Sequence, residues 1–372
     1  MTPAIIDLFC GIGGLGLGAA RAGFHLALAV DNDSTPLKIH KLNFPGFLHS
    51  ESDVSILSGD ELLATAKLNR GTLAGLIGGS PCQGFSRIGK RDSRDERNAL
   101  FAHFFRLVLE VLPSFFVAEN VPGILDSHNN RLLDGAQESV TDLYQLLEPL
   151  VLDASDFGAP TVRKRVFFIG YLPDKVESLA AEDFDREKWA QKTTVEIALT
   201  GLPRRLKDTW LTDEFGWRPL RVTRCGRYWT KIHGEIPQGI GDEETLAKFR
   251  EDRLVSGCIA TLHTTEVKRR FGRVPEGGVD PISRAQRLHR HGQCPTLRAG
   301  TGPERGSFQA LRPIHFNEPR AITPREAARL QGFPDWFRFD STKWHSFQGI
   351  GNSVSPFVAE AIFRAIYRKL RQ

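Results

Sequence analysis

The sequence predicts an α/β protein built on an open, doubly wound and mostly parallel β-sheet. In the first 170 residues of this 372-residue chain, short apolar runs alternate with stretches of helical apolar spacing. Such alternation is typical of parallel sheets with helices on both faces. Ligands of these sheets bind beyond the carboxyl ends of the strands, so the residues that follow each apolar run are the first candidates for a site.

The predicted elements can be placed in chain order. Apolar runs bounded by turn residues predict strands at 4–9, 26–30, 73–77, 115–118 and 166–170. Between them, apolar residues that recur about every 3.6 positions predict helices at about 15–24, 35–42, 98–112 and 131–149. Each helix should bury one face against the sheet.

The composition fits a soluble globular protein, with 41% hydrophobic and 25% charged residues and a length that allows two domains. The cysteines, at 10, 82, 225, 258 and 294, form no Cys-x-x-Cys pair or Cys/His cluster. This pattern argues against a metal site and against a disulfide framework. The chain has no long apolar run and no basic leader, so we expect a cytoplasmic protein without a membrane partner.

Positive charge is concentrated in one region of the chain. Residues 201–320 contain 22 Lys and Arg against 14 Asp and Glu, a net charge of +8 within a chain of net charge +5. Aromatic residues are interleaved there, at Trp210, Trp217, Tyr228, Trp229 and Phe271. Arginines mixed with aromatic residues favour a nucleic-acid partner, although a solvated basic surface would look the same.

The first predicted strand runs into a glycine-rich turn. Gly11, Gly13 and Gly16 match G-x-G-x-x-G between a strand and a helix, a spacing that lets the backbone approach a ligand. Asp31 closes the next strand, where a carboxylate can accept from ribose hydroxyls. The pattern fits a nicotinamide dinucleotide or another adenosine-bearing cofactor such as S-adenosylmethionine; a turn without a ligand stays open.

A cysteine follows the third predicted strand on a short polar turn. Pro81 precedes Cys82, and Gln83, Gly84 and Ser86 follow it. A thiol reacts as the thiolate, which needs exposure and polar surroundings, so this setting suits a nucleophile. A small buried hydrophobe is the alternative.

Charged residues stand beside the next two strands. Glu119 ends the run 115–118, where partial desolvation favours the protonated form and suits it to donate to a substrate nitrogen. A plain salt-bridge role is the alternative. Arg163 and Arg165 precede the run 166–170, and strand alternation should point both the same way, toward phosphate or carbonyl oxygens.

These pieces together resemble the DNA (cytosine-5)-methyltransferase family of bacterial restriction–modification systems. The matching segments occur in the family's order and are 7–18, Asp31, 53–54, 81–86, 119–121, 163–165, 323–335 and 351–354. The resemblance implies a Rossmann-like S-adenosylmethionine-dependent catalytic domain of residues 1–180, completed by 340–372. Residues 181–339 would then form a smaller, irregular target-recognition domain.

The resemblance also implies a mechanism. A cytosine is flipped out of the duplex, and the Cys82 thiolate adds to carbon 6, so that carbon 5 takes the methyl group. Glu119 would hydrogen-bond ring nitrogen 3 and the exocyclic amine, and Arg165, with Arg163 beside it, would hold the carbonyl at carbon 2. The chain departs from the family at Thr161, where glutamine is usual.

The cofactor implied is S-adenosylmethionine, which leaves as S-adenosylhomocysteine. Asp31 would bind its ribose, Asp53 and Val54 its adenine, and the C-terminal helix over 356–370 should fold back beside the first strand. The other implied cofactor residues are Phe9, Gly11, Ile12, Gly13, Gly14, Asn32, Pro81, Leu100, Asn352 and Ser353.

Double-stranded DNA is the implied partner of what we expect to be a monomer, with a cognate restriction endonuclease acting separately. Ser86, Arg97 and Thr296 are the implied DNA contacts, and residues 83–98 have the composition of a loop that closes over DNA. Phosphate contacts are expected from Lys268, Arg269, Arg270, Arg284, Arg287 and Arg290.

Three other functions would each explain part of the sequence. A nicotinamide-dependent oxidoreductase explains the glycine turn and Asp31 but gives no role to Cys82 or Glu119. An RNA cytosine methyltransferase shares the chemistry and differs in its methyl acceptor. A non-catalytic DNA-binding module has no need of Cys82 and Glu119.

Overall fold

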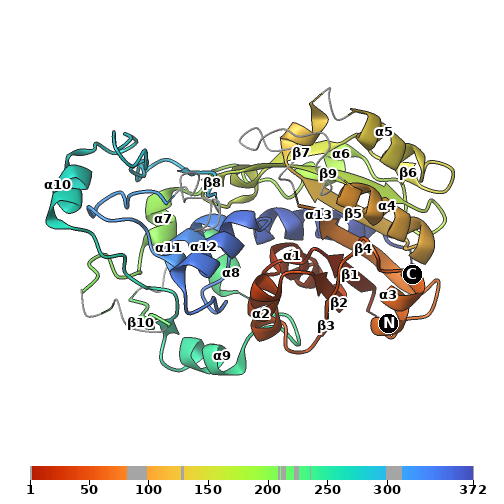
Figure 1. Cartoon of the computed structure of the whole chain (residues 1–372), viewed down its shortest axis with the longest axis horizontal. Coiled ribbons are helices and arrows are strands. Elements are labelled where there is room, and N and C mark those ends of the chain that lie inside the picture. The colour runs from red at the N-terminus through yellow and green to blue at the C-terminus, as the bar shows by residue number, and fades with distance from the viewer. Residues whose placement is uncertain are drawn as a thin grey trace.

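An eight-stranded β-sheet with helices on both faces forms the centre of the protein (Figure 1). The computed structural model describes residues 2–81, 99–126, 130–207, 210, 215–221, 226–234, 236–298 and 312–371. The strands of this sheet are β1 Ala4–Leu8, β2 His25–Asp31, β3 Leu48–Glu51, β4 Leu73–Gly79, β5 Phe115–Asn120, β6 Gln145–Leu146, β7 Leu150–Asp153 and β9 Lys164–Tyr171.

The order of the strands is β3-β2-β1-β4-β5-β9-β6, and β7 also pairs with β9. Strands β1 to β5 pair in parallel, whereas β9 runs antiparallel to β5, β6 and β7. The predicted open, mostly parallel α/β sheet is therefore confirmed. The chain order reverses between β1 and β4, the point at which sheets of this kind bind ligands.

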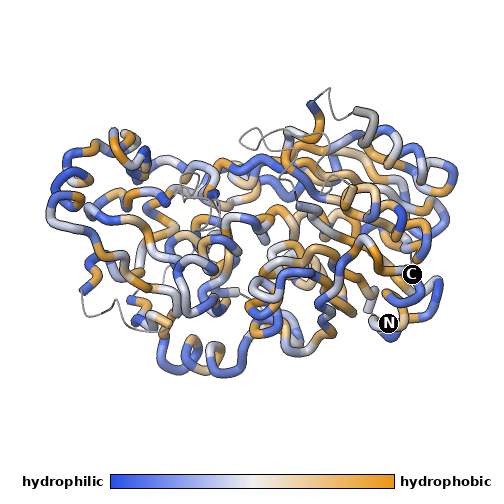
Figure 2. Tube along the Cα trace, in the orientation of Figure 1, coloured by the Kyte–Doolittle hydropathy of each residue, from blue (hydrophilic) through white to orange (hydrophobic). Residues whose placement is uncertain are grey.

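Two helical layers cover the sheet. One contains α1 Gly14–Arg21, α2 Ser34–Asn43 and α13 Pro356–Lys369; the other contains α3 Gly59–Thr65, α4 Ala99–Val111 and α5 Asn130–Glu138. Ile5 and Ile6, neighbours on β1, are fully buried in opposite layers, as the two-residue period of a strand requires. Figure 2 shows the resulting concentration of apolar residues along the central strands.

Local capping explains where several of these helices begin. The Asp33 side chain accepts a hydrogen bond from the Thr35 amide at the start of α2, and Ser58 and Glu61 form a capping box at the start of α3. The C-terminal helix α13 packs along α1, the helix that follows β1.

The five predicted strands and the first three predicted helices are confirmed. The helix predicted over 131–149 is wrong in its second half, because α5 ends at Glu138 and β6 follows. Tyr144 is buried there, and its hydroxyl donates to the Pro113 carbonyl at 2.8 Å. The apolar residues of this segment thus pack at the edge of the sheet instead of along one helix face. Strand β3 and helix α3 were not predicted.

Short elements make up the region beyond β9. Its helices are α6 Ala181–Asp185, α7 Val195–Leu199, α8 Arg227–His233, α9 Glu243–Arg250, α10 Thr265–Arg273, α11 Pro324–Gln331 and α12 Lys343–Asn352. Two small ladders pair β10 Arg218–Pro219 with β11 Leu254–Val255, and β8 Thr161–Val162 with β12 Cys294–Pro295. The remaining described elements are the 3-10 helices η2 Pro122–Leu125 and η4 Ala154–Phe157.

Helix α11 connects separate segments of this region through buried charge. Arg329 pairs with both carboxylate oxygens of Asp335 at 2.7 Å and donates to the carbonyls of Ala198 and Thr200. Arg325 donates to the Ser256 carbonyl at 2.7 Å and to Pro334 at 2.8 Å. The segment 323–335, which the sequence showed only as one of the matches to the family, therefore holds several separate segments of the chain together.

Candidate active site

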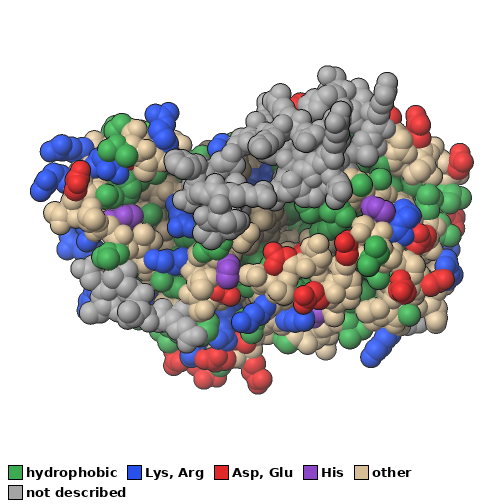
Figure 3. Space-filling model, viewed as in Figure 1, with side chains coloured by type: hydrophobic (Ala, Val, Ile, Leu, Met, Phe, Trp, Pro, Cys, Tyr) green, Lys and Arg blue, Asp and Glu red, His purple; other side chains and the backbone are tan. Residues whose placement is uncertain are grey.

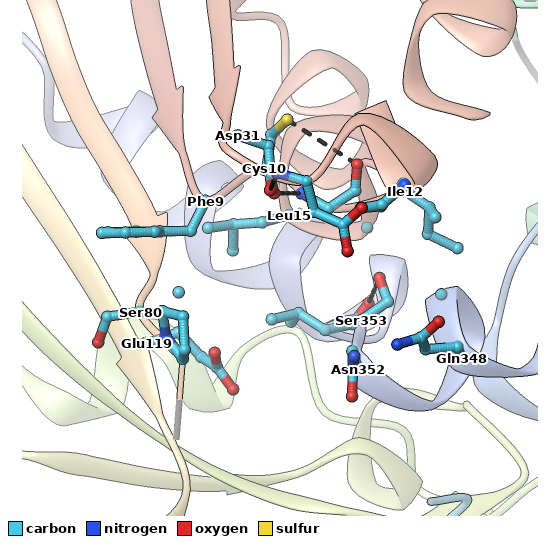
Figure 4. A pocket seen from close by; sticks show the side chains of 18 of the residues that line it. Phe9, Cys10, Ile12, Leu15, Asp31, Ser80, Glu119, Gln348, Asn352 and Ser353 are labelled. Carbon is cyan, nitrogen blue, oxygen red and sulfur yellow. Dashed lines mark hydrogen bonds between the residues drawn. The ribbon is translucent and has the colours of Figure 1, made fainter. Parts of the chain in front are cut away.

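A cavity of about 430 Å³ opens at the carboxyl ends of β1, β2, β4 and β5 (Figure 4). This volume lies in the range of pockets that hold drug-sized ligands. The C-terminal end of α12 closes the cavity from the other side. The predicted site residues that line it are Phe9, Gly11, Ile12, Gly14, Asp31, Asn32, Pro81, Leu100, Glu119, Arg165, Asn352 and Ser353.

The glycine-rich turn after β1 shapes one wall. Phe9 and Gly11 both have φ 55°, and Gly13 has φ 93°, a left-handed conformation that costs a non-glycine residue free energy. The N-cap residue Gly13 offers no side chain to cap α1, so amide groups of the first turn are available to a ligand. This wall can accommodate an anionic ligand group.

Two carboxylates lie beneath this turn. Asp31 accepts hydrogen bonds from the amides of Gly11 at 2.8 Å and Asp33 at 2.9 Å. Burial raises the pKa of Asp31, and these amide hydrogen bonds oppose the shift. Asp7 is buried more deeply, and burial together with the charge of Asp31 raises its pKa well above the ordinary value. Asp31 keeps lone pairs free for a ligand donor.

Glu119 and Arg165 form an ion pair on the opposite wall. The Arg165 Nε lies 2.8 Å from Glu119 Oε1, and the Glu119 side chain is 9% exposed. Burial raises the pKa of Glu119, while the charges of Arg165 and then Arg163 oppose the rise. A β-carbon on Gly79 of the neighbouring strand would stand 2.6 Å from Glu119 Oε2 and would displace that carboxylate. The pair can present both a proton donor and a cation to a planar polar ligand.

Arg163 corrects the prediction that both arginines face the site. It lies between β8 and β9, only 2% exposed, and is absent from the cavity lining. Its guanidinium donates to the Leu297 carbonyl at 3.2 Å and to the Gly351 carbonyl at 2.7 Å. Because both terminal nitrogens are bound to protein carbonyls, the direct ligand role expected for Arg163 is not supported by its position.

Three predicted cofactor residues also lie outside the lining. A β-carbon on Gly13 would meet Phe44, so this glycine serves the packing of the turn. The Asp53 carboxylate accepts from the Ser55 amide at 2.8 Å, and Val54 is 2% exposed within the core. The adenine role of Asp53 and Val54 therefore stays a prediction.

Thr296, a predicted DNA contact, also lies outside the cavity lining, and its hydroxyl donates to the Val162 carbonyl at 2.7 Å.

Cys82, Ser86 and Arg97 lie outside the described residues, as does the predicted loop 83–98. The residues immediately before Cys82, Ser80 and Pro81, line the cavity. The buried side-chain amide of Asn120 donates to the Ser80 hydroxyl at 3.1 Å and fixes that wall at the end of β5.

Several lining residues were not predicted. Asp7 and Cys10 belong to the glycine-turn segment, and His345 and Gln348 lie on α12 before Asn352. The helical spacing of 345, 348, 349 and 352 could have indicated this face, since residues three and four apart share one side of a helix. Burial raises the pKa of Cys10 well above its ordinary value, which suits packing rather than nucleophilic attack.

Thr161, the departure noted in the sequence, is fully buried and outside the cavity lining. Its hydroxyl donates to the Cys294 carbonyl at 3.1 Å. The side chain therefore joins β8 to β12 instead of facing a ligand.

The strand order, the glycine turn and the carboxylates at the strand ends define an enzyme of the Rossmann-like class. Comparison with known proteins narrows this class. The chain belongs to the C-5 cytosine-specific DNA methylase family, whose sequence model matches residues 4–368.

Two Type II methyltransferases match almost the whole chain. The Type II methyltransferase M.XorII of Xanthomonas oryzae pv. oryzae is 38% identical over 100% of this chain and 86% of its own. The Type II methyltransferase M1.HphI of Haemophilus parahaemolyticus is 31% identical over 99% of this chain and 87% of its own.

Solved structures agree with this membership. A prophage-encoded E. coli protein assigned as a DNA modification methyltransferase superposes with a TM-score of 0.89 at 45% identity and covers 99% of both chains. The S. pombe Dnmt2 methyltransferase, at 18% identity and TM-score 0.62 over 98% of both chains, shares the fold.

The protein is thus a DNA (cytosine-5)-methyltransferase of an S-adenosylmethionine-dependent family, as the resemblance implied. Within the described ranges, no group of three or more His, Cys, Asp or Glu is placed to hold a metal ion. None of the helices in those ranges has the length and apolar composition needed to cross a membrane.

Proposed function

We propose that the cavity binds S-adenosylmethionine beside a flipped cytosine, and that the chain methylates carbon 5 of that base within a specific duplex DNA sequence. The observation that carries this proposal is the buried Glu119–Arg165 pair, which shares one cavity with the glycine turn and Asp31. A base-binding pair and a nucleoside-binding carboxylate in one pocket suit direct transfer between two ligands.

The residues present fit the cofactor. Asp31, held by two amides, accepts from the ribose hydroxyls, and Asn32 lies beside it. Phe9 and Leu100 offer apolar surface to the adenine, near which we also place Asp53 and Val54. The uncapped first turn of α1 donates to the methionine carboxylate. When bound, S-adenosylmethionine supplies an electrophilic methyl group on its sulfonium.

Ser353 and Val354 complete the cofactor pocket through close packing on α1. A β-carbon on Gly14 would overlap the Ser353 hydroxyl and the Val354 carbonyl. We therefore expect Gly14→Ala to weaken S-adenosylhomocysteine binding by about tenfold or more, because Ser353 and Val354 must shift to make room for the β-carbon. Isothermal titration calorimetry measures this effect.

Gly135→Ala is the matched control, since a β-carbon on this α5 residue meets nothing within 4 Å. It should leave the affinity unchanged and add slightly to stability, as glycine is a poor helix former. Equal affinities of Gly14→Ala and the wild type would exclude Ser353 and Val354 from the cofactor pocket.

The base-binding wall performs the proton chemistry. Glu119, whose pKa is raised by burial, donates a proton to ring nitrogen 3 of the cytosine and accepts from its exocyclic amine. Arg165 donates to the carbonyl at carbon 2. These contacts stabilise the charge that develops on the ring when the Cys82 thiolate adds to carbon 6. Carbon 5 then attacks the methyl group, and loss of its proton expels the thiolate.

Residues 1–180 with 340–372 serve as the catalytic domain in this proposal, and 181–339 read the DNA. The side chains of Arg269, Arg273 and Arg284 are exposed and, among the described residues, make no ion pair or hydrogen bond. Figure 3 shows Lys and Arg gathered over the end of the molecule formed by α10. These arginines are suited to phosphates, which position the duplex without specifying sequence.

Other basic residues of that region are already used within the protein. Arg270 pairs with Asp280 at 2.8 Å, Arg290 pairs with Glu276 at 2.8 Å, and Arg287 donates to the Phe316 carbonyl at 3.0 Å. The phosphate contacts expected from these three arginines are therefore better assigned to the exposed set. Thr296, Ser86 and Arg97 remain proposed DNA contacts, and a monomer that protects host DNA from a cognate endonuclease remains the proposed setting.

Bisulfite sequencing of duplex DNA incubated with the purified protein and S-adenosylmethionine tests the proposed function. Protected cytosines should appear at one short recurring sequence, and tRNA offered in parallel should stay unmodified. Methylation of tRNA with none of duplex DNA would contradict the proposal and favour the RNA methyltransferase alternative. Nicotinamide binding in place of S-adenosylmethionine binding would favour the oxidoreductase.

A further inference from the structure

A compact joint links the catalytic sheet to the segment that precedes residue 299. The ladder of β8 and β12 pairs Thr161 with Cys294 and Val162 with Pro295. The Cys294 amide donates to the Pro160 carbonyl at 2.8 Å. Thr161 and Thr296 then donate in opposite directions across the same ladder, at 3.1 Å and 2.7 Å. Residues 294–297 are thereby fixed against 160–163 along their length.

Arg163 extends this joint to the cavity. One terminal nitrogen donates to the Leu297 carbonyl, at the end of the joint, and the other donates to the Gly351 carbonyl, one residue before Asn352. Asn352 and Ser353 line the cavity, and so does the preceding Gly351. The single buried guanidinium of Arg163 is therefore hydrogen-bonded to both the proposed DNA-facing segment and the proposed cofactor wall.

The planar fork of arginine suits this task. Two terminal nitrogens at a fixed separation hold two carbonyls at a fixed separation, which the single ammonium of lysine cannot do. Arg163 also directly precedes β9, which carries Arg165 and pairs with the strand that carries Glu119. A shift of Leu297 or Gly351 would thus change the distance between the base-binding and cofactor-binding walls.

Resting on the proposed function, we propose that Arg163 is a positioning residue that sets the spacing between the DNA-facing segment, the cofactor wall and the Glu119–Arg165 pair. It acts through the carbonyls that it holds and does not touch the reacting atoms. Loss of this spacing should weaken the binding of DNA and of the cofactor together. Thr161 holds the DNA side alone, because its side-chain hydrogen bond reaches only Cys294.

The test measures two dissociation constants for each variant. Calorimetry gives that of S-adenosylhomocysteine, and fluorescence anisotropy gives that of a duplex containing the sequence found by bisulfite sequencing. We expect Arg163→Met to weaken both by about tenfold to a hundredfold, since misplacement by an ångström has effects of that size. Compared with Arg163→Met, Arg163→Lys should recover part of the lost affinity for one of the two ligands. Thr161→Val should weaken DNA binding and leave cofactor binding unchanged.

Arg21→Lys is the matched control for a buried arginine. Arg21 also donates to a carbonyl of a distant segment, Lys231 at 3.0 Å, but from the last residue of α1, away from the cavity lining. It should lower the thermal midpoint without changing either dissociation constant. If the Arg163 variants do the same, Arg163 is merely structural and the inference is wrong.

The inference and the proposed function fail in different ways. A wild-type protein that binds neither S-adenosylhomocysteine nor duplex DNA would overturn both. A wild type that binds both ligands, with Arg163→Met binding only one of them more weakly, would overturn the shared positioning role and leave the proposed function intact.

Discussion

Replacement of Cys82 by alanine is expected to abolish methyl transfer while leaving cofactor affinity within about twofold of the wild type. Carbon 5 of cytosine is a weak nucleophile, and without thiolate addition at carbon 6 it gains no electron density. Loss of a covalent nucleophile lowers turnover by about a thousandfold or more in comparable enzymes. Transfer of tritiated methyl groups to duplex DNA measures turnover, and calorimetry with S-adenosylhomocysteine measures binding.

Cys258→Ala is the control for general effects of removing a thiol. Cys258 is 1% exposed, and burial raises its pKa to about 12, so it is not a nucleophile at neutral pH. This variant should keep its turnover and lose only the stability associated with a small cavity. Turnover by Cys82→Ala close to that of the wild type would show that another group attacks the base.

Replacement of Glu119 by glutamine is expected to lower kcat by about a hundredfold to a thousandfold, the usual effect of removing one charge-stabilising donor. Glutamine keeps the size of the side chain but cannot supply a proton to ring nitrogen 3. It also breaks the ion pair with Arg165. Affinity for S-adenosylhomocysteine should be unchanged, so a parallel loss of cofactor binding would place Glu119 in a structural role.

The pH dependence of turnover gives a second test of Glu119. Burial raises the pKa of this carboxyl above its ordinary value, so the protonated form persists to higher pH than in an exposed glutamate. Turnover that needs this form should be present below the raised pKa and fall as pH rises through it. Glu119→Gln has no such titration, and its residual activity should lack that descending limb. A limb retained in the variant would assign the titration to another group.

The local pattern of the sequence was sufficient for the sheet and for much of the site. Strand and helix periods are local properties, and parallel strands end at one edge, so Asp31, Glu119 and the glycine turn were predicted to meet. They do meet in the cavity. The same reasoning missed Asp7 as a lining residue, since a carboxylate inside a strand gives no separate signal.

Long-range contacts explain where the local pattern failed. Strand alternation predicted that Arg163 and Arg165 point the same way, but the strand is interrupted between Val162 and Lys164. Arg163 turns instead to Leu297 and Gly351, which are 134 and 188 residues away in sequence. A local window contains no information about such partners.

Buried charge illustrates the same limit. Hydropathy predicts that a segment with two arginines and a glutamate lies at the surface, yet Arg325, Glu326 and Arg329 are each at most 2% exposed. Arg325 and Arg329 donate to the carbonyls of Ser256 and Ala198, 69 and 131 residues away. Arg320 pairs with Glu326 and Asp335 pairs with Arg329, so each buried charge has a partner that offsets its desolvation. The helix itself was not predicted, and its role became visible only with those partners in place.

Covalent capture on modified DNA tests the proposed chemistry most directly. The protein is incubated with S-adenosylmethionine and a duplex that carries 5-fluorocytosine at the methylated position, and peptides are then sequenced by mass spectrometry. Because fluorine cannot leave as a proton does, the methylated base should stay bonded to the sulfur of Cys82. Absence of any adduct, together with a methyl group on the exocyclic nitrogen of ordinary cytosine, would contradict attack by Cys82 and transfer to carbon 5.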